Sequence, residues 1–204
     1  MKEIRAFNFE VRAEKSEERG HYLSGRPIVF DTPTDMGWYT EIIDSGALDN
    51  TDLRDVRFLV NHNTDMIPLA RSRNNNANST MQMVVVAEGM DIRVDLDTEN
   101  NSESRNLYSA VERGDITGRS FMLTVDNDTW TDQDSDHPTR RIHSIGKVYE
   151  VSAVTWPAYE ATSISVRGLS GALESARASL ESAKAARREI ERKKQKIKIL
   201  TEVM

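Results

Sequence analysis

One serine in the chain has surroundings that suit a nucleophile. Residues 114–125 read GDITGRSFMLTV, a strand-like run in which Gly118 and Ser120 interrupt the apolar residues. Side chains alternate between the two faces of a strand, so Ser120 shares its face with the apolar Ile116 and Met122. A lone hydroxyl on an apolar face, beside a glycine that leaves room for backbone, could act as a nucleophile. The alternative is an ordinary strand serine that is hydrogen-bonded to the backbone.

A glutamate stands between valines in a second strand-like run, KVYEVSAVTW. The residues that alternate onto one face of this run are Val148, Glu150, Ser152, Val154 and Trp156. A carboxylate between valines is costly unless it is hydrogen-bonded or paired, so Glu150 needs an imidazole or a guanidinium as partner. An imidazole partner would make Glu150 the acid of a Ser/His/acid set, which holds the histidine in one tautomer. The alternative is a structural ion pair with an arginine, for which the candidates are Arg119, Arg140 and Arg141.

His62 is the candidate general base. It ends DVRFLVNH, residues 55–62, and is the one histidine that directly follows a strongly apolar strand. The other three are His21 and His137, in loop-like stretches, and His143, at the start of a strand. A core histidine with satisfied hydrogen bonds is the alternative, because such residues are commoner than catalytic bases.

The composition excludes several kinds of site. The 204 residues include no cysteine, so disulfides, thiolate catalysis and cysteine-ligated zinc are ruled out. Asp132, Asp134 and Asp136 have the one-three-five spacing of a calcium loop. However, His137 and His143 stand where such a loop requires glycine and glutamate, so we predict no calcium site.

Charge and hydropathy limit the partners. The N-terminal stretch MKEIRAFNFEVRAEKSEERG is charged throughout, so we predict no secretory signal. No apolar run approaches membrane-spanning length, which predicts no membrane partner. Residues 168–204 carry nine Lys/Arg and five Asp/Glu, a net charge of +4, whereas the remainder carries 18 and 28, a net charge of −10. An acidic body argues against nucleic acid as a partner.

Strand signals dominate the body of the chain. We predict strands over residues 4–12, 22–30, 38–43, 55–62, 81–97 (two strands joined at Glu88–Gly89), 116–125, 140–159 (two runs) and 163–168. In the first of them, Ile4 and Ala6 are expected to point inward. The stretch 126–139 reads as an acidic loop.

One helix is predicted within the body, over residues 101–114. Asn101 or Ser102 can cap it, an apolar stripe that includes Leu107 and Val111 runs along it, and Gly114 can end it.

Several longer stretches bring the candidate residues together in a recognisable order. VNHNTDMIPLAR contains His62, SRNLYSAVERGDITGRSFML contains Ser120, and KVYEVSAVTWPAYEATSISVR contains Glu150. Together with the earlier SGRPIVFDTPTDMGWYTEIIDSGAL, they resemble the prohead maturation protease family of tailed bacteriophages, over residues 3–167. That family is similar in fold to herpesvirus assemblin proteases. The resemblance therefore implies an α+β protein with a small, mostly antiparallel β-barrel surrounded by helices.

The resemblance implies a catalytic set of His62, Ser120 and Glu150. His62 would take the proton of Ser120, which would attack a peptide carbonyl, and Glu150 would hold the imidazole. Assemblins use a second histidine in place of the acid, which leaves His143 as the alternative third member. The oxyanion would be met by backbone N–H near Arg119–Ser120, with an arginine from Arg119, Arg140 or Arg141 as a further donor. This mechanism needs no metal and no organic cofactor.

Two positions depart from the family pattern. Asn63 stands where an acidic residue often follows the histidine, and Met122-Leu123 replaces a Gly-Phe pair beyond the serine. The first could loosen the orientation of His62, and the second changes the side-chain volume beyond Ser120. Neither removes a catalytic group.

The resemblance also implies substrates and a location. The substrates would be the scaffold or capsid delta segment, the major capsid protein and the protease itself, inside the assembling procapsid in the bacterial cytoplasm. The alternative is a non-catalytic capsid assembly or scaffolding protein in which Ser120 and His62 merely pack.

The C-terminal residues 168–204 are predicted to form a helix outside the 1–167 protease domain. Apolar residues recur at seven-residue spacing from Leu169, but the neighbouring row ends in Arg187 and Lys194, which argues against a strong coiled coil. Such a helix could dock on the body, join two copies of the chain or bind scaffold.

Overall fold

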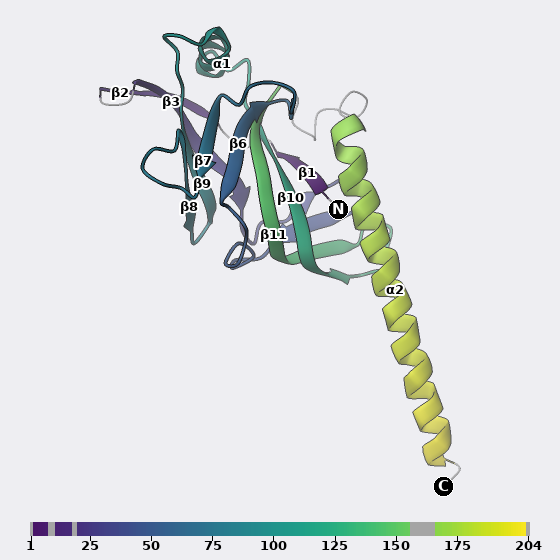
Figure 1. The fold of residues 1–204 in the computed structure, drawn as a ribbon. Coiled ribbons are helices and arrows are strands. Elements are labelled where there is room, and N and C mark those ends of the chain that lie inside the picture. Colours follow the sequence, from purple (N-terminus) through teal and green to yellow (C-terminus); the bar gives the residue numbers. More distant parts are fainter. Residues whose placement is uncertain (1, 8–10, 18–19, 156–165, 203–204) are drawn as a thin grey trace.

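The computed structural model describes residues 2–7, 11–17, 20–155 and 166–202. It contains eleven strands and two helices in mixed α+β order (Figure 1). In chain order these are β1 (Lys2–Phe7), β2 (Arg12–Ser16), β3 (Gly20–Val29), β4 (Thr34–Asp35), β5 (Thr40–Ile43), β6 (Asp55–Val60), β7 (Ala70–Arg73), β8 (Met81–Val86), β9 (Gly89–Asp95), α1 (Ser102–Glu112), β10 (Gly118–Thr131), β11 (Thr139–Val154) and α2 (Val166–Glu202).

A seven-stranded sheet is built around the long strand β11. Strand order is β1-β10-β11-β5-β4, with β6 also paired to β11 and β7 paired to β6. The two parallel neighbours share β11: β5 pairs with its residues 139–142 and β6 with its residues 150–153. This arrangement places the end of β6, which leads to His62, beside the part of β11 that carries Glu150.

The second sheet is four-stranded and antiparallel, in the order β2-β3-β9-β8. A common core fills the space between elements of both sheets, and it includes Phe58, Phe121 and Val151 from the larger sheet and Ile92 and Val94 from the smaller one. Burial of these apolar side chains is the main force that holds the two sheets together.

Over the described residues, neither sheet closes into a barrel. The predicted α+β class is confirmed, but the predicted barrel was wrong. The local strand pattern cannot distinguish the two arrangements, because closure depends on whether the first and last strands of a sheet pair with each other.

The predicted helix of the body is confirmed. The side chain of Asn101 accepts hydrogen bonds from the N–H groups of Glu103 and Ser104, Leu107 is buried, and Gly114 follows the helix with φ of +80°. All these determinants are local in sequence, which is why the pattern was readable.

Two predicted segments differ in the structure. Half of the expected loop 126–139 is strand, because β10 runs to Thr131 and β11 begins at Thr139, so the two form one long hairpin with residues 132–138 as its tip. Backbone pairing along this hairpin outweighs the polar composition of residues 126–131. The expected strand 163–168 ends inside α2, which begins at Val166, and its first three residues lie outside the described part of the chain. Part of the second run within 140–159 also lies outside it.

The first strand turns charged residues inward. In β1, Glu3 and Arg5 are buried and Ile4 is half-buried, the reverse of the prediction, while the side chain of Ala6 is not described. Glu3 and Arg5 belong to a buried ion-pair cluster whose members are Glu3, Arg5, Glu41, Asp128 and Arg140. The charged side chains of this strand point inward because their ionic partners lie on β5, β10 and β11.

The helix α2 lies along β1 and β10 over its first half and then extends beyond the body (Figure 1). Ala172, Ala176 and Leu180 are buried, and the last two pack with Tyr39 and Trp130. The hydroxyl of Ser175 donates to Glu3 at 2.5 Å and that of Ser179 donates to Asp128 at 2.8 Å, so the helix also caps the ion-pair cluster. From residue 185 to residue 199 every side chain is exposed. Neither described helix has an apolar stretch that would suffice to cross a membrane.

Candidate active site

His62 and Glu150 form a hydrogen-bonded pair. Nδ1 of His62 lies 2.6 Å from Oε1 of Glu150, and the carboxylate side chain is only 3% exposed. The partner of the buried Glu150 carboxylate is therefore an imidazole. The sequence alone allowed either an imidazole or an arginine as this partner. Nε2 of His62 is buried and has no hydrogen-bond partner among the described residues. The ring is thus held through one nitrogen while the other is left for a further group.

The turn after β6 sets the direction of the imidazole. Asn61 and His62 both have left-handed backbones, with φ of 51° and 57°. Such conformations cost non-glycine residues free energy and persist only where surrounding contacts hold them. Here the N–H of Asn61 donates to the carbonyl of Ala153 at 2.9 Å, and its side-chain oxygen accepts from the N–H and hydroxyl of Thr155, both at 2.9 Å.

Ser120 lies on the face of the sheet that carries Glu150. Ser120 on β10 is directly opposite Ser152 on β11, and Met122 is opposite Glu150. Opposite residues of an antiparallel pair share a face, with Cβ atoms about 5 Å apart. Ser120 is completely buried, and its hydroxyl donates to the main-chain carbonyl of Arg5 at 2.6 Å. The structure thus brings the serine to the face that carries Glu150 but gives its hydroxyl a partner on β1.

Ser152 also contacts the histidine–glutamate pair and had no role in the sequence-based set. Its hydroxyl donates to Oε2 of Glu150 at 2.5 Å and accepts the N–H of His62 at 3.2 Å. The alternation of KVYEVSAVTW already put Ser152 on the face of Glu150, which was the available signal.

Arg119 points away from this face. Adjacent strand residues face opposite sides, and the guanidinium of Arg119 reaches the smaller sheet, where Nη2 donates to the carbonyl of Ser24 at 2.6 Å. Gly25 has φ of +147° there, and a Cβ atom at this position would lie 1.5 Å from Nη2 of Arg119. A side chain at Gly25 is therefore incompatible with this position of the guanidinium.

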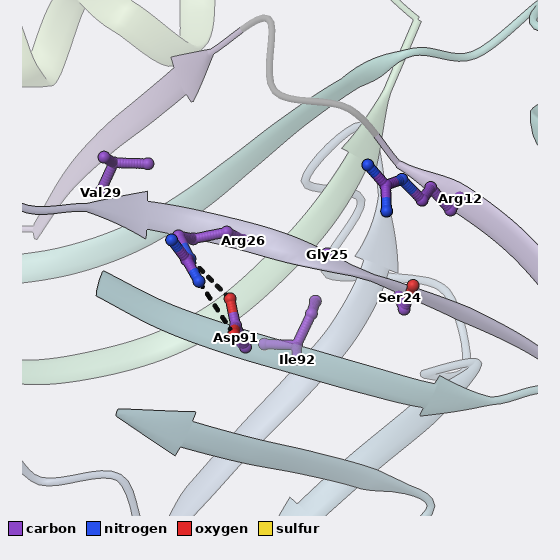
Figure 2. Close-up of a pocket in the computed structure, with 7 residues that line it drawn as sticks. All are labelled: Arg12, Ser24, Gly25, Arg26, Val29, Asp91 and Ile92. Atoms are coloured by element: carbon purple, nitrogen blue, oxygen red, sulfur yellow. Dashed lines mark hydrogen bonds and ion pairs between the residues drawn. The ribbon is translucent and has the colours of Figure 1, made fainter. Parts of the chain in front are cut away.

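The outer side of Gly25 lines a cavity of about 520 Å³ on the smaller sheet (Figure 2). Arg26 and Asp91 form a two-pronged ion pair across it, with distances of 2.7 and 3.1 Å. Arg12 is the third charged residue that lines this cavity, and His62 is not among its lining residues.

The remaining candidates lie towards the other end of β11. Arg140 is buried in the ion-pair cluster, and Arg141 pairs with Asp44. The two ring nitrogens of His143 contact Asp44 at 2.6 Å and Thr129 at 2.8 Å. None of these contacts involves His62 or Ser120, and His143 and Glu150 are seven positions apart on β11, about 23 Å of extended chain.

A cavity of about 470 Å³ opens beside the turn that carries His62. Asn61 and Asn63, the neighbours of His62, line one side of it, and Leu107 and Ala110 of α1 line another. Ile116, which precedes β10, completes an apolar wall. The cavity is large enough to take an apolar side chain.

In a Ser/His/acid triad the carboxylate holds one ring nitrogen of the histidine and the serine hydroxyl bonds the other. Here the first contact is present, between Glu150 and His62, whereas the hydroxyl of Ser120 bonds the carbonyl of Arg5. The sequence matches the family model described as Caudovirus prohead serine protease over residues 7–175. The chain therefore belongs to the family of caudovirus prohead serine proteases.

The solved structure of the capsid assembly protease gp21 of bacteriophage T4 aligns with 76% of this chain and 98% of its own, at 11% sequence identity and a TM-score of 0.38. No curated protein matches the chain.

Proposed function

We propose that the chain is a serine endopeptidase of phage head maturation, with Ser120 as nucleophile, His62 as general base and Glu150 as the acid that orients His62. The observation that carries the proposal is the hydrogen bond between Nδ1 of His62 and Glu150, which leaves the buried Nε2 without a partner among the described residues. A buried ring nitrogen without a hydrogen-bond partner costs free energy, and a serine hydroxyl could donate the missing hydrogen bond.

The reaction follows from these groups. Nε2 of His62 takes the proton of Ser120 as Oγ attacks the carbonyl carbon of the scissile peptide bond. The tetrahedral intermediate collapses when His62 gives that proton to the departing amine, which leaves an acyl-serine. Water, deprotonated by His62, then attacks the acyl carbon and Ser120 leaves with the proton. Throughout, Glu150 stabilises the imidazolium and fixes its orientation.

Before attack, Ser120 must exchange the Arg5 carbonyl for Nε2 of His62. Strand β10 is paired on both sides, with β1 and with β11. Successive N–H groups of a strand point to opposite neighbours, so either Arg119 or Ser120 directs its N–H at β1. Movement of β1 would therefore release both the hydroxyl and an N–H group for the oxyanion. Glu150 is preferred to His143 as third member because the described contacts of His143 are with Asp44 and Thr129.

The substrates we propose are the scaffold or capsid delta segment, the major capsid protein and the protease itself, within the procapsid of an infected bacterium. Membership of the prohead protease family supports this choice. Residues 185–204 carry seven Lys/Arg and three Asp/Glu, a net charge of +4. The protruding half of α2 thus suits an acidic scaffold surface or a contact between copies of the chain.

The second candidate is a non-catalytic assembly protein. The complete burial of Ser120 and its hydrogen bond to Arg5 favour that alternative. A fluorophosphonate probe decides between the two. A protease should be labelled at Ser120, with labelling lost in Ser120→Ala and kept in Ser104→Ala, a buried serine of α1. Absence of labelling under conditions where capsid cleavage also fails would favour the assembly protein.

A further inference from the structure

Ser152 connects the two residues that hold the imidazole. The serine is completely buried on β11, between β10 and β6. Its single hydroxyl donates to Oε2 of Glu150 and accepts the main-chain N–H of His62. One side chain therefore contacts both the carboxylate of the pair and the backbone of the histidine.

The first contact determines how the carboxylate is oriented. Oε1 of Glu150 contacts Nδ1 of His62, so Oε2 would be a buried oxygen without a donor if Ser152 did not supply one. A buried charged oxygen that lacks its hydrogen bond is costly. Without the hydroxyl, the carboxylate would turn or admit water to satisfy both oxygens, and the bond to the imidazole would lose its fixed geometry.

The second contact stabilises the backbone of the base. His62 has a left-handed backbone with φ of 57°, which directs its ring back towards β11. Its N–H is satisfied by Oγ of Ser152 at 3.2 Å. Loss of that acceptor would remove this hydrogen bond at a position whose backbone is already strained.

The same contacts argue against Ser152 as the nucleophile. The hydroxyl of Ser152 donates its proton to Glu150. The ring atom that could accept a proton from the nucleophile is Nε2, which lies on the other side of the imidazole from Nδ1. Ser152 instead lies directly opposite Ser120 in the sheet.

We propose that Ser152 is a positioning residue, which acts through His62 and Glu150 and does not touch the peptide. It fixes the imidazole in the tautomer that protonates Nδ1 and leaves Nε2 ready to accept. This inference rests on the proposed protease function. A small displacement of a general base costs on the order of a hundredfold in rate, because proton transfer requires a narrow geometry.

The test compares Ser152→Ala with Ser152→Thr, which retains the hydroxyl. Ser104→Ala is the matched control, since Ser104 is also a completely buried serine but its hydroxyl has no hydrogen-bond partner among the described residues. For Ser152→Ala we expect kcat to fall between about tenfold and a hundredfold with KM nearly unchanged. Ser104→Ala should match the parent chain, and Ser152→Thr should recover most of the lost rate.

The ¹⁵N NMR signals of His62 report the tautomer of its ring. These signals should stay unchanged if Ser152 only contributes to packing. The parent chain and Ser152→Thr should show a single Nδ1–H tautomer, and Ser152→Ala should show a mixture. A Ser152→Ala protein with the parent kcat and an unchanged His62 spectrum would overturn the inference. If the parent chain is never labelled at Ser120, the proposed function fails, whereas the His62 spectra still decide whether Ser152 positions the ring.

Discussion

The hydroxyl of Ser120 donates its hydrogen bond to the main-chain carbonyl of Arg5, at 2.6 Å. The strand β1 therefore covers the candidate nucleophile and pairs with β10 along its whole length, from Lys2 opposite Thr124 to Phe7 opposite Arg119. The proposed attack by Ser120 on a peptide requires this contact to break, so the position of β1 is predicted to control activity.

Covalent attachment of β1 to β10 should block the active site. Ile4 lies directly opposite Met122, and the chain contains no other cysteine, so Ile4→Cys with Met122→Cys offers one defined disulfide. We expect the oxidised double variant to lose fluorophosphonate labelling at Ser120 and to recover it on reduction. Each single variant under the same oxidant is the control. Equal labelling before and after reduction, with the disulfide verified by mass, would show that β1 need not move.

Ser120→Ala and His62→Ala should each abolish cleavage of capsid protein while the protein stays folded. The two groups act as one unit, so each loss should be about a thousandfold or more and the double variant should lose no more than a single one. Rates of processing and the circular dichroism spectrum check this. Undiminished processing by either variant, or losses that multiply, would contradict the assignment.

Glu150→Gln should reduce the rate strongly, because an amide can present its N–H to Nδ1 of His62 and favour the wrong tautomer. His143→Ala should be mild, since the contacts of His143 are with Asp44 and Thr129 near the other end of β11. Steady-state rates on one peptide substrate provide the comparison. The opposite ranking would transfer the role of third catalytic residue to His143.

The two halves of α2 should respond differently to truncation. A chain that ends after Lys184 keeps the buried Ala172, Ala176 and Leu180 and should melt as the full chain does. A chain that ends after Gly168 uncovers the ion-pair cluster and should lose on the order of 10 °C in Tm, or its cooperative transition altogether. Identical melting of both truncated chains would show that α2 adds nothing to the body.

The protruding half of α2 should matter for assembly. The chain that ends after Lys184 should retain peptide cleavage but be poorly incorporated into procapsids, because the net +4 of residues 185–204 is removed. Incorporation of the full chain should weaken with added salt, which screens exposed charges. Salt-independent incorporation of both chains would count against an electrostatic contact.

Acid should destabilise the fold through Glu3. Burial opposes its ionisation, but Arg5 and Arg140 prevail and lower its pKa to about 2. Its folded-state pKa lies below the unfolded value, so the unfolded chain binds the proton first and the stability from Glu3 falls between about pH 5 and pH 2. Glu3→Gln should be less stable than the parent at pH 7, and the difference should shrink as pH falls, as measured by urea unfolding. A constant difference would exclude this role of Glu3.

Local patterns in the sequence were sufficient for several parts of this protein. The helix α1 was predictable because its cap at Asn101, its apolar stripe and its terminal Gly114 all lie within one short stretch, residues 101–114. Alternation likewise put Glu150 and Ser152 on one face of their strand, since the side-chain period of two is a property of every strand. The catalytic roles of His62, Ser120 and Glu150 came from a resemblance to the family and stay predictions.

Only the tertiary structure decided which groups meet. Glu150 pairs with His62, 88 positions away, and not with an arginine, because β6 runs parallel to the end of β11. Glu3 and Arg5 turn inward against the local pattern because their partners come from distant strands. Sheet closure and the docking of α2 depend likewise on contacts between residues far apart in sequence. Local periodicity specifies a face, whereas strand pairing specifies what lies across from it.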